Sequence, residues 1–225
     1  MQTVILAAGK GIRMRHLTKN NSKGMVELAD KPMLEVIVDR LEPVSDEIIL
    51  VVNRKQKDIQ EHFGRSKKIK FAYQEKPLGT ANALAAAEPL IRDRFIMING
   101  DELIPEEDIK KFAESEPYAI AACQTTEPER FGVLSCENGF LLNINEKPDI
   151  HGTCLVNSGM YMLERDIFDA IRKTELSARG EYEITDSIKI LMDSGFRVSV
   201  FQLSKWTTVT SPEDMPEAIK CVTED

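Results

Sequence analysis

A glycine-containing, basic segment follows the first apolar run of the chain and suits an anionic ligand. It reads Leu6-Ala-Ala-Gly-Lys-Gly-Ile-Arg-Met14, with Lys23 after a short polar stretch. Gly9 and Gly11 allow the backbone to come close to a ligand and to present its N–H groups. Arg13 and Lys23 add positive charge, so these groups together could hold a triphosphate. Taken alone, the pattern is also compatible with a plain turn after a strand.

The positive charge is concentrated at the amino-terminal end of an acidic chain. The formal net charge is −8, yet residues 1–26 contain no Asp or Glu. Such an arrangement favours a small anionic ligand, with a solvated basic loop as the alternative. The overall charge argues against broad nucleic-acid or anionic-membrane binding. The basic residues of this stretch are Lys10, Arg13, Arg15, Lys19 and Lys23.

A carboxylate follows another apolar run, in Asn99-Gly100-Asp101. Asp101 could bind a divalent cation that bridges phosphate groups. An ordinary aspartate between a strand and a loop is the alternative. The amino-terminal segment Leu6–Met14 is not a Walker A loop, because the G-x-x-x-x-G-K-[ST] spacing is absent. It is not a dinucleotide fingerprint either, because Met14 occupies the third glycine position.

Two further polar segments suit parts of a nucleotide or a sugar. In the segment from Gln74 to Ala81, Gln74 offers an amide to a base edge and Gly79 permits close approach. Farther along the chain, the Glu146 carboxylate suits sugar hydroxyls and the Lys147 ammonium suits a monophosphate. A turn with a helix cap, and an exposed charged pair before a proline, are the respective alternatives.

The elements that must position these residues alternate through the first hundred residues. Short apolar runs predict strands and amphipathic stretches predict helices, which gives a mainly parallel sheet covered by helices. Ligands bind beyond the carboxyl ends of such strands. The predicted strands span 3–8, 47–52, 69–73 and 95–98. Two predicted helices begin at Pro32 and Lys55, and a third, capped by Thr80, runs towards Ala87.

The second half predicts a more mixed pattern within one domain that spans residues 1–225. Glu137-Asn138-Gly139 is typical of a hairpin turn between strands at 133–135 and 140–144. We expect a twisted central sheet with a small β-rich lobe over about residues 130–160. Other predicted strands lie at 118–124, 160–163 and 197–203, with helices near 165–173 and 184–193 and from Pro212 onwards.

Composition limits the remaining possibilities. The four cysteines contain no C-x-x-C pair, which argues against a zinc site or a thioredoxin-like motif. No apolar run approaches the roughly 20 residues of a membrane span. We therefore expect a cytoplasmic protein with free thiols, and the sequence leaves open whether copies associate into a homo-oligomer.

Across nearly its whole length the chain resembles the sugar-1-phosphate nucleotidylyltransferases, and especially the glucose-1-phosphate thymidylyltransferases. The resemblance implies a three-layer Rossmann-like α/β fold, with no carboxyl-terminal β-helix domain. It is carried, in family order, by Leu6–Met14, Leu17-Thr18, Ser22-Lys23, Lys31-Pro-Met33, Pro77-Leu-Gly-Thr-Ala81, Asn99-Gly-Asp101, Phe131-Gly-Val133, Glu146-Lys-Pro148, Gly180-Glu-Tyr-Glu-Ile-Thr-Asp186 and Ser211-Pro-Glu-Asp214.

The resemblance implies a role for each candidate residue. Arg13 would stabilise the reacting α-phosphate, Lys23 would contact phosphate, and Asp101 would hold Mg²⁺. Gly132, Glu146 and Asn157 would face the sugar. Lys147 would contact the phosphate of the sugar 1-phosphate. The implied nucleotide-binding residues are Leu6, Ala8, Gly9, Gly11, Gln74, Gly79 and Thr80.

The implied reaction joins a nucleoside triphosphate (dTTP, UTP or GTP) to a sugar 1-phosphate, giving an NDP-sugar and pyrophosphate. A sugar 1-phosphate is already an anion near neutral pH, so its oxygen attacks without a general base. The transfer needs mainly positioning and charge neutralisation.

Two departures from the family pattern keep alternatives open. The family has a second metal-binding aspartate in W-x-D-x-G-x-P-E-D, where this chain has Thr208, with Thr210 at the glycine position. His16 stands where proline is usual, with little expected effect. Because a hydroxyl is a much poorer magnesium ligand than a carboxylate, a catalytically weakened nucleotide-sugar-binding or regulatory protein is the alternative. A glycosyltransferase is a third reading, but the sequence at Asp101–Leu103 lacks its D-x-D pattern.

Overall fold

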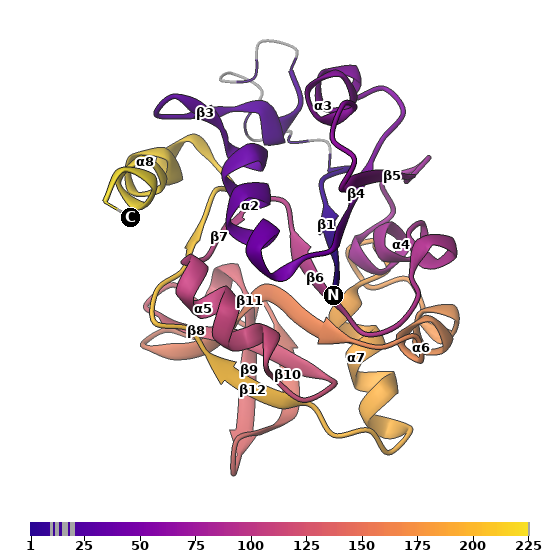
Figure 1. Cartoon of the computed structure of the whole chain (residues 1–225). Helices are drawn as coiled ribbons and strands as arrows, with labels where there is room; N and C mark the ends of the chain where they lie inside the picture. Colours follow the sequence, from indigo (N-terminus) through magenta and orange to yellow (C-terminus); the bar gives the residue numbers. More distant parts are fainter. Residues whose placement is uncertain (10, 12–13, 15–17, 19–20, 225) are drawn as a thin grey trace.

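A mixed sheet with nine strands among the described residues forms the centre of the protein (Figure 1). The structure is a computed structural model that describes residues 1–9, 11, 14, 18 and 21–224. The strand order is β5-β4-β1-β6-β11-β8-β12-β10-β9. In chain order the strands are β1 (Gln2–Leu6), β4 (Glu47–Val52), β5 (Ile69–Tyr73), β6 (Phe95–Asn99), β8 (Ala119–Thr125), β9 (Gly132–Glu137), β10 (Phe140–Glu146), β11 (Cys154–Leu163) and β12 (Ser199–Gln202).

The parallel part of the sheet consists of β5, β4, β1 and β6, together with the β8–β12 pair. Successive strand residues contribute to opposite faces, as the period-two geometry of a strand requires. In β4, for example, Ile48 and Leu50 belong to one buried apolar cluster, while Ile49 and Val51 belong to the other. Both faces of these strands are therefore covered.

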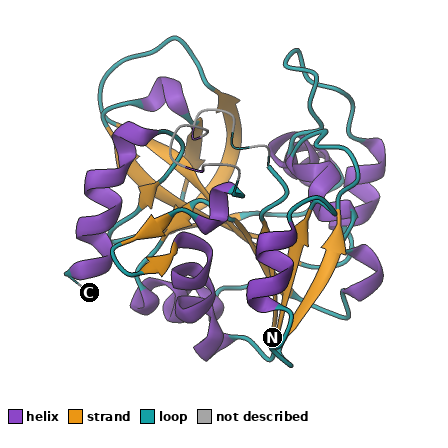
Figure 2. Cartoon of the chain, turned by 90° about the horizontal axis from the view of Figure 1, so that it is seen from above, coloured by secondary structure: helices purple, strands orange, loops and turns teal. Residues whose placement is uncertain are grey.

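Helices cover the two faces (Figure 2). The α/β class and the three-layer arrangement predicted from the sequence are confirmed. Among the described residues no helix is long and apolar enough to cross a membrane. Buried residues of α2 (Met33–Leu41), α3 (Lys57–Phe63), α5 (Glu106–Ala113) and α8 (Met215–Thr223) share one apolar cluster, and those of α4 (Thr80–Ala85), α6 (Ile167–Lys173) and α7 (Ile184–Asp193) share the other.

The second half of the sheet is antiparallel around β11, which pairs with β6, β8 and β9. The predicted hairpin is present as β9 and β10, and its two-residue turn places Asn138 at φ 49° and Gly139 at φ 79°. Two positive φ values match the turn type that Asn-Gly favours. Because β10 pairs with β12 and β9 pairs with β11, the hairpin continues the same sheet.

Several predicted boundaries shift in the structure. β11 begins at Cys154, six residues before the predicted strand, and α3 begins at Lys57. Pro32 lies just before the first residue of α2 instead of within the helix. The predicted cap by Thr80 is wrong for its own helix: Thr80 is the first residue of α4, and its Oγ1 accepts a hydrogen bond from Ile184 N of α7 at 2.9 Å.

Two short antiparallel ladders lie outside the main sheet. One pairs β2 (Glu27–Leu28) with β3 (Lys31–Pro32). The other pairs β7 (Glu102–Leu103), which follows β6 closely, with β13 (Thr207–Thr208). Because β13 comes from the carboxyl-terminal part of the chain, this second ladder brings positions 102 and 208 opposite each other.

Candidate active site

A cleft of about 720 Å³ opens at the carboxyl ends of β1 and β6, where their last residues Leu6 and Asn99 are paired. Parallel α/β sheets present ligand sites at this edge. Arg13 and Lys10 lie outside the described residues. All the predicted site residues that the structure describes line the cleft: Leu6, Ala8, Gly9, Gly11, Lys23, Gln74, Gly79, Thr80, Asp101, Gly132, Glu146, Lys147 and Asn157.

The predicted phosphate and metal residues are in contact. Lys23 Nζ forms an ion pair with Asp101 Oδ2, and both side chains are largely shielded from solvent. Gly11 adopts φ 55°, and a Cβ on it would lie 2.8 Å from Cβ of Lys23, so only glycine lets the loop pack here. The preceding Ser22 is held by Asp58, which accepts hydrogen bonds from its backbone and side chain at 2.5 and 2.7 Å.

A second carboxylate, Glu102, is buried beside Asp101. Trp206 Nε1 donates a hydrogen bond to its Oε2 at 2.7 Å. Burial, and after it the charge of Asp101, raise the pKa of the Glu102 carboxyl well above its usual range. Thr208 faces Glu102 across the β7–β13 ladder, and its hydroxyl acts to lower that pKa.

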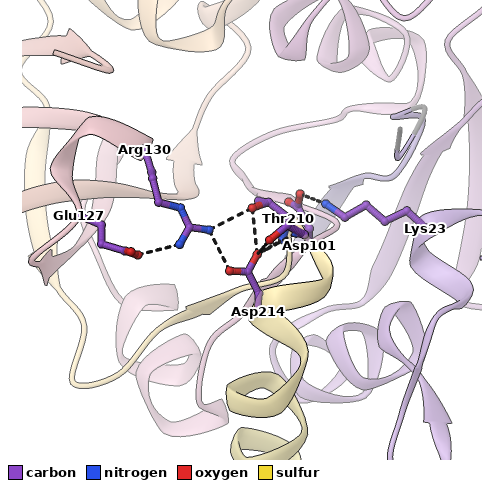
Figure 3. A network of polar contacts seen from close by, with 7 residues as sticks. Lys23, Asp101, Glu127, Arg130, Thr210 and Asp214 are labelled. Atoms are coloured by element: carbon purple, nitrogen blue, oxygen red, sulfur yellow. Dashed lines mark hydrogen bonds and ion pairs between the residues drawn. The ribbon is translucent and has the colours of Figure 1, made fainter. Parts of the chain in front are cut away.

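The loop after β13 is fixed by a polar network around Asp214 (Figure 3). Arg130 donates to Asp214 Oδ1 at 2.9 Å, and the backbone N–H groups of Thr210 and Ser211 donate to Oδ2 at 2.7 and 2.8 Å. Burial by itself would raise the pKa of Asp214, but these hydrogen bonds outweigh it and hold the pKa below its usual range. Val209 N also donates to Asp101 O at 2.9 Å, so the network positions the strand beside Asp101.

The predicted base-binding segment is joined to the start of α7, a hundred residues later. Tyr182 N donates to Leu78 O at 2.8 Å, and Ala81 N donates to Tyr182 O at 2.9 Å. Gln74 is buried, and its Nε2 donates to Gly79 O at 3.1 Å and Asn82 Oδ1 at 2.9 Å. These contacts engage the Gln74 amide within the protein and hold Gly79 against Tyr182.

We expect Gly79→Ala to destabilise the protein strongly. Gly79 adopts φ 109° and ψ 175°, and an added Cβ would lie 2.4 Å from Tyr182 O. Strain and the clash together should cost on the order of 3 kcal/mol, or about 10 °C in Tm. Gly139→Ala is the matched control, because Gly139 also has positive φ but open space around its Cβ position. Equal Tm values for the two variants would contradict the close packing of Gly79 on Tyr182.

At the other end of the cleft, the predicted sugar-facing residues lie together. A Cβ on Gly132 would lie 3.0 Å from Glu146 Oε1, so the absence of a side chain there makes room for this carboxylate. Asn157 Nδ2 donates to the Tyr161 hydroxyl at 2.5 Å, and Gly159 N donates to Asn157 Oδ1 at 2.9 Å. Lys147 N donates to Phe131 O at 2.9 Å, which anchors the backbone of the predicted phosphate ligand.

Sequence reasoning assigned no role to several polar residues of the cleft. Arg179 lines it and forms ion pairs with Glu183 at 2.7 Å and Glu146 at 3.7 Å. Burial raises the pKa of Glu183, and the positive charge of Arg179 lowers it only in part. Arg179 directly precedes the Gly180–Asp186 motif, and this position in the sequence could have identified it as a candidate site residue. The other cleft residues without an assigned role include Asn99, Glu102, Arg130, Tyr161, Glu181 and Thr185.

The donor set beside Asp101 suits a hard divalent cation that takes part of its coordination from a ligand. Asp101 and Glu102 offer carboxylates, and the buried Thr208 offers a hydroxyl opposite Glu102. Within residues 1–9, 11, 14, 18 and 21–224, no group of three or more His, Cys, Asp and Glu residues has the arrangement of a metal site. A cation bound here would therefore need oxygen ligands from substrate phosphates and water.

Comparison with known proteins identifies relatives over the whole chain. Residues 2–225 match the model of the Nucleotidyl transferase family. The bifunctional protein GlmU of Methanocaldococcus jannaschii is 39% identical over 222 residues, which cover 98% of this chain and 54% of GlmU. The UTP–glucose-1-phosphate uridylyltransferase AglF of Haloferax volcanii is 33% identical over 230 residues, which cover 97% of this chain and 95% of AglF. The chain thus spans about half of GlmU but nearly all of AglF.

Solved structures agree with these relatives. A putative glucose-1-phosphate thymidylyltransferase from Bacillus anthracis, in complex with sucrose, superposes with a TM-score of 0.88 at 25% identity, covering 100% of this chain and 96% of that one. A UDP-glucose pyrophosphorylase complexed with UDP-glucose shares the fold, with a TM-score of 0.86 at 22% identity over 99% of this chain and 98% of that one. The chain therefore belongs to the nucleotidyl transferase family, and the membership among sugar-1-phosphate nucleotidylyltransferases that its motifs indicate is confirmed.

Proposed function

We propose that the protein transfers a nucleotidyl group from dTTP, UTP or GTP to a sugar 1-phosphate and releases pyrophosphate. The observation that carries this proposal is the shared cleft, which has the Lys23–Asp101 pair at one end and Glu146, Lys147 and Asn157 at the other. A cation and a carboxylate suit a metal-bound polyphosphate, whereas carboxylate, ammonium and amide groups suit a sugar phosphate. A nucleoside triphosphate at one end and a sugar 1-phosphate at the other would place the α-phosphate of the first next to the phosphate of the second.

In the proposed reaction, an oxygen of the sugar 1-phosphate attacks the α-phosphorus of the triphosphate. The new O–P bond forms as the bond to the β-phosphate oxygen breaks, and pyrophosphate leaves with those electrons. Lys147 and Arg179 would hold the attacking phosphate, and Lys23 would offset negative charge on the triphosphate. No residue has to remove a proton, because the attacking phosphate is already ionised near neutral pH.

A magnesium ion fits this arrangement, with Asp101 as its principal protein ligand. When bound, it would neutralise charge on the phosphate oxygens. Lys23 is paired with Asp101 in the structure, so binding of phosphate and cation would draw these two side chains apart towards separate partners. Arg13, which the family resemblance places on the α-phosphate, remains an expectation because it lies outside the described residues.

A second candidate function is nucleotide-sugar binding without efficient turnover. Thr208 favours it, because this residue lies opposite Glu102, close to Asp101, and brings a hydroxyl where the family pattern has a carboxylate. Tight binding of a nucleotide sugar by a protein that releases no pyrophosphate would support this candidate over the enzyme.

The choice of first substrates comes from the relatives. AglF is named for UTP and glucose 1-phosphate, and the Bacillus anthracis protein is named for thymidylyl transfer to glucose 1-phosphate. UTP and dTTP with glucose 1-phosphate are therefore the first pairs to test, followed by GTP. We expect Mg²⁺-dependent pyrophosphate release from at least one pair, measured by a coupled pyrophosphatase assay.

The assay needs a panel because neither the base nor the sugar follows from the cleft alone. Each triphosphate would be combined with the 1-phosphates of glucose, galactose, mannose and N-acetylglucosamine, with reactions lacking either substrate as controls. Absence of pyrophosphate release across this panel would refute the proposed activity.

A further inference from the structure

The start of helix α3 contacts both ends of the chain segment between residues 7 and 22, which includes the predicted phosphate-binding glycines. Gln56, which directly precedes α3, donates from its Nε2 to Ala7 O at 2.9 Å. Asp58, in the first turn of α3, accepts hydrogen bonds from Ser22 N at 2.5 Å and from Ser22 Oγ at 2.7 Å. The point where the segment leaves the sheet and the point where it ends are therefore held by one short stretch of the chain.

The Ser22 hydroxyl is used for this contact and not for a local one. Ser22 occupies the N-cap position of η2 (Lys23–Met25), a single turn of 3-10 helix. At φ −67° and ψ 149° it has the extended backbone in which a serine hydroxyl commonly accepts a hydrogen bond from the turn that follows. It makes no such cap, and its hydroxyl donates to Asp58. The contact thus takes the place of a local cap and fixes Ser22 to a helix 36 residues away in the sequence.

The residue that Ser22 positions is Lys23, the first residue of η2. Its ammonium pairs with Asp101, and its side chain is only 16% exposed. The turn that carries it is closed by Met25 N, which donates to Ser22 O at 2.9 Å. A lysine side chain has several rotatable bonds, so the placement of its backbone limits where the ammonium can reach. Asp58 is thereby linked to the Lys23 ammonium through a single intervening residue.

This link becomes more important when ligands bind. In the ligand-free structure, Asp101 holds the Lys23 ammonium. A cation on Asp101 would remove that tether and leave Lys23 to the phosphates. The backbone anchor at Ser22 would then be what keeps Lys23 in place. Misplacing a charged group by about 1 Å can lower the rate of such a transfer by about 10²-fold.

We propose that Asp58 is a positioning residue for nucleotidyl transfer, which acts through Ser22 to place Lys23 on the triphosphate. Asp58 is not among the described residues that line the cleft, so its effect on kinetics would have to pass through Ser22. The inference rests on the proposed function, since it takes a nucleoside triphosphate as the ligand of Lys23. No catalytic role is assigned to Asp58 itself.

The test compares graded losses of the Asp58–Ser22 contact. Asp58→Ala removes both hydrogen bonds and should lower kcat/KM for the triphosphate about 10- to 100-fold. Asp58→Asn keeps an acceptor oxygen and should lie between the wild type and Asp58→Ala. Ser22→Ala removes only the hydroxyl and should cost about two- to fivefold. In all three variants the KM for the sugar 1-phosphate should stay within twofold, because Lys23 lies at the triphosphate end.

A double-mutant cycle tests whether the effect passes through Lys23. Asp58→Ala should lower kcat/KM by less than a further twofold in a Lys23→Ala protein, because the residue on which it acts is already gone. Gln56→Ala, which acts on Ala7 instead, should lower kcat/KM by the same factor with and without Lys23. That comparison shows that the Lys23→Ala protein still has measurable activity to lose.

A carboxylate at the opposite edge of the sheet provides the control for stability. Asp166 accepts a hydrogen bond from the Tyr118 hydroxyl at 2.8 Å. It follows the end of β11, where Leu163 pairs with Phe95, the first residue of β6. Asp166→Ala should lower Tm as Asp58→Ala does, because each variant loses a hydrogen-bonded carboxylate, but it should leave kcat/KM unchanged.

The outcomes separate the inference from the proposed function. If the wild-type protein releases pyrophosphate and Asp58→Ala keeps kcat/KM within threefold, the inference is overturned and the activity stands. An equal cost of Asp58→Ala with and without Lys23 would overturn it in the same way.

Calorimetric binding of UTP, dTTP and GTP with Mg²⁺ covers the case in which the wild-type protein releases no pyrophosphate. The proposed function then fails. A Kd about tenfold higher in Asp58→Ala would still uphold the placement of Lys23, since about one charge-assisted contact is lost, whereas an unchanged Kd would overturn it. A wild-type protein that binds none of the three triphosphates refutes both.

Discussion

Replacing Asp101 with asparagine is expected to lower the rate of pyrophosphate release by about 10²- to 10³-fold, because the cation that would offset charge on the phosphates loses its principal protein ligand. An amide keeps the shape of the side chain but loses the charge that pairs with Lys23 and attracts a cation. The decrease should be in kcat more than in the KM for the sugar phosphate, because Asp101 lies at the triphosphate end of the cleft. Initial rates at saturating substrate, with Mg²⁺ varied, measure it.

A carboxylate far from the cleft supplies the control for Asp101. Asp46 pairs with the amino terminus, and its side chain is 82% exposed. Asp46→Asn changes the same functional group and the same net charge, and should retain wild-type kcat. Both variants should keep a wild-type circular dichroism spectrum. An Asp101→Asn protein with more than a third of wild-type kcat would contradict the assigned role.

Introducing an aspartate at Thr208 is expected to destabilise the metal-free protein. The new carboxylate would lie opposite buried Glu102 and close to Asp101, where like charges in a shielded site repel each other. A cost of about 2 to 3 kcal/mol corresponds to a Tm lower by about 5–10 °C in a chain of this size. Adding Mg²⁺ or Mn²⁺ should restore much of this loss, because a cation binds the folded, carboxylate-rich site preferentially.

Two variants identify the cause of that change. Thr208→Asn introduces a side chain of similar size without charge and should lower Tm far less. Combining Thr208→Asp with Glu102→Gln removes one of the neighbouring negative charges and should recover part of the Tm in the absence of a cation. If Thr208→Asp and Thr208→Asn have the same Tm without metal, charge repulsion is not the cause and Glu102 is not close enough to matter.

The same Thr208→Asp protein bears on the second candidate function. A gain in kcat with Mg²⁺ would indicate that the threonine had weakened a metal-binding position. Unchanged kcat with Mg²⁺ would instead indicate that the hydroxyl at this position does not limit turnover.

Local patterns predicted much of the scaffold. The strand at 47–52 and the strand at 69–73 have the predicted bounds, because short apolar runs between polar breaks leave little freedom in where a strand starts and ends. The Asn138-Gly139 turn was equally predictable, because a two-residue hairpin turn requires positive φ at both positions. Those features depend on neighbours in sequence.

One prediction failed because the residue acts on a distant segment. Thr80 has the side chain of a helix cap and was expected to serve its own helix, but its hydroxyl accepts a hydrogen bond from Ile184, which packs beside it only in the folded chain. For Gln74 the fold adds contacts from its Nε2 to Gly79 O and Asn82 Oδ1, and its role at a base edge stays a prediction. No local pattern reports such partners.

The sequence by itself determined the family motifs, most of the strands and helices along the chain, and part of the set of residues that line the cleft. Only the tertiary structure decided that Glu102 is buried beside Asp101, that Thr208 faces it from a hundred residues away, and that Arg179 pairs with both Glu146 and Glu183. The physical reason is that burial and hydrogen-bond pairing depend on which groups long-range packing brings together, whereas strand periodicity and turn chemistry depend on adjacent residues.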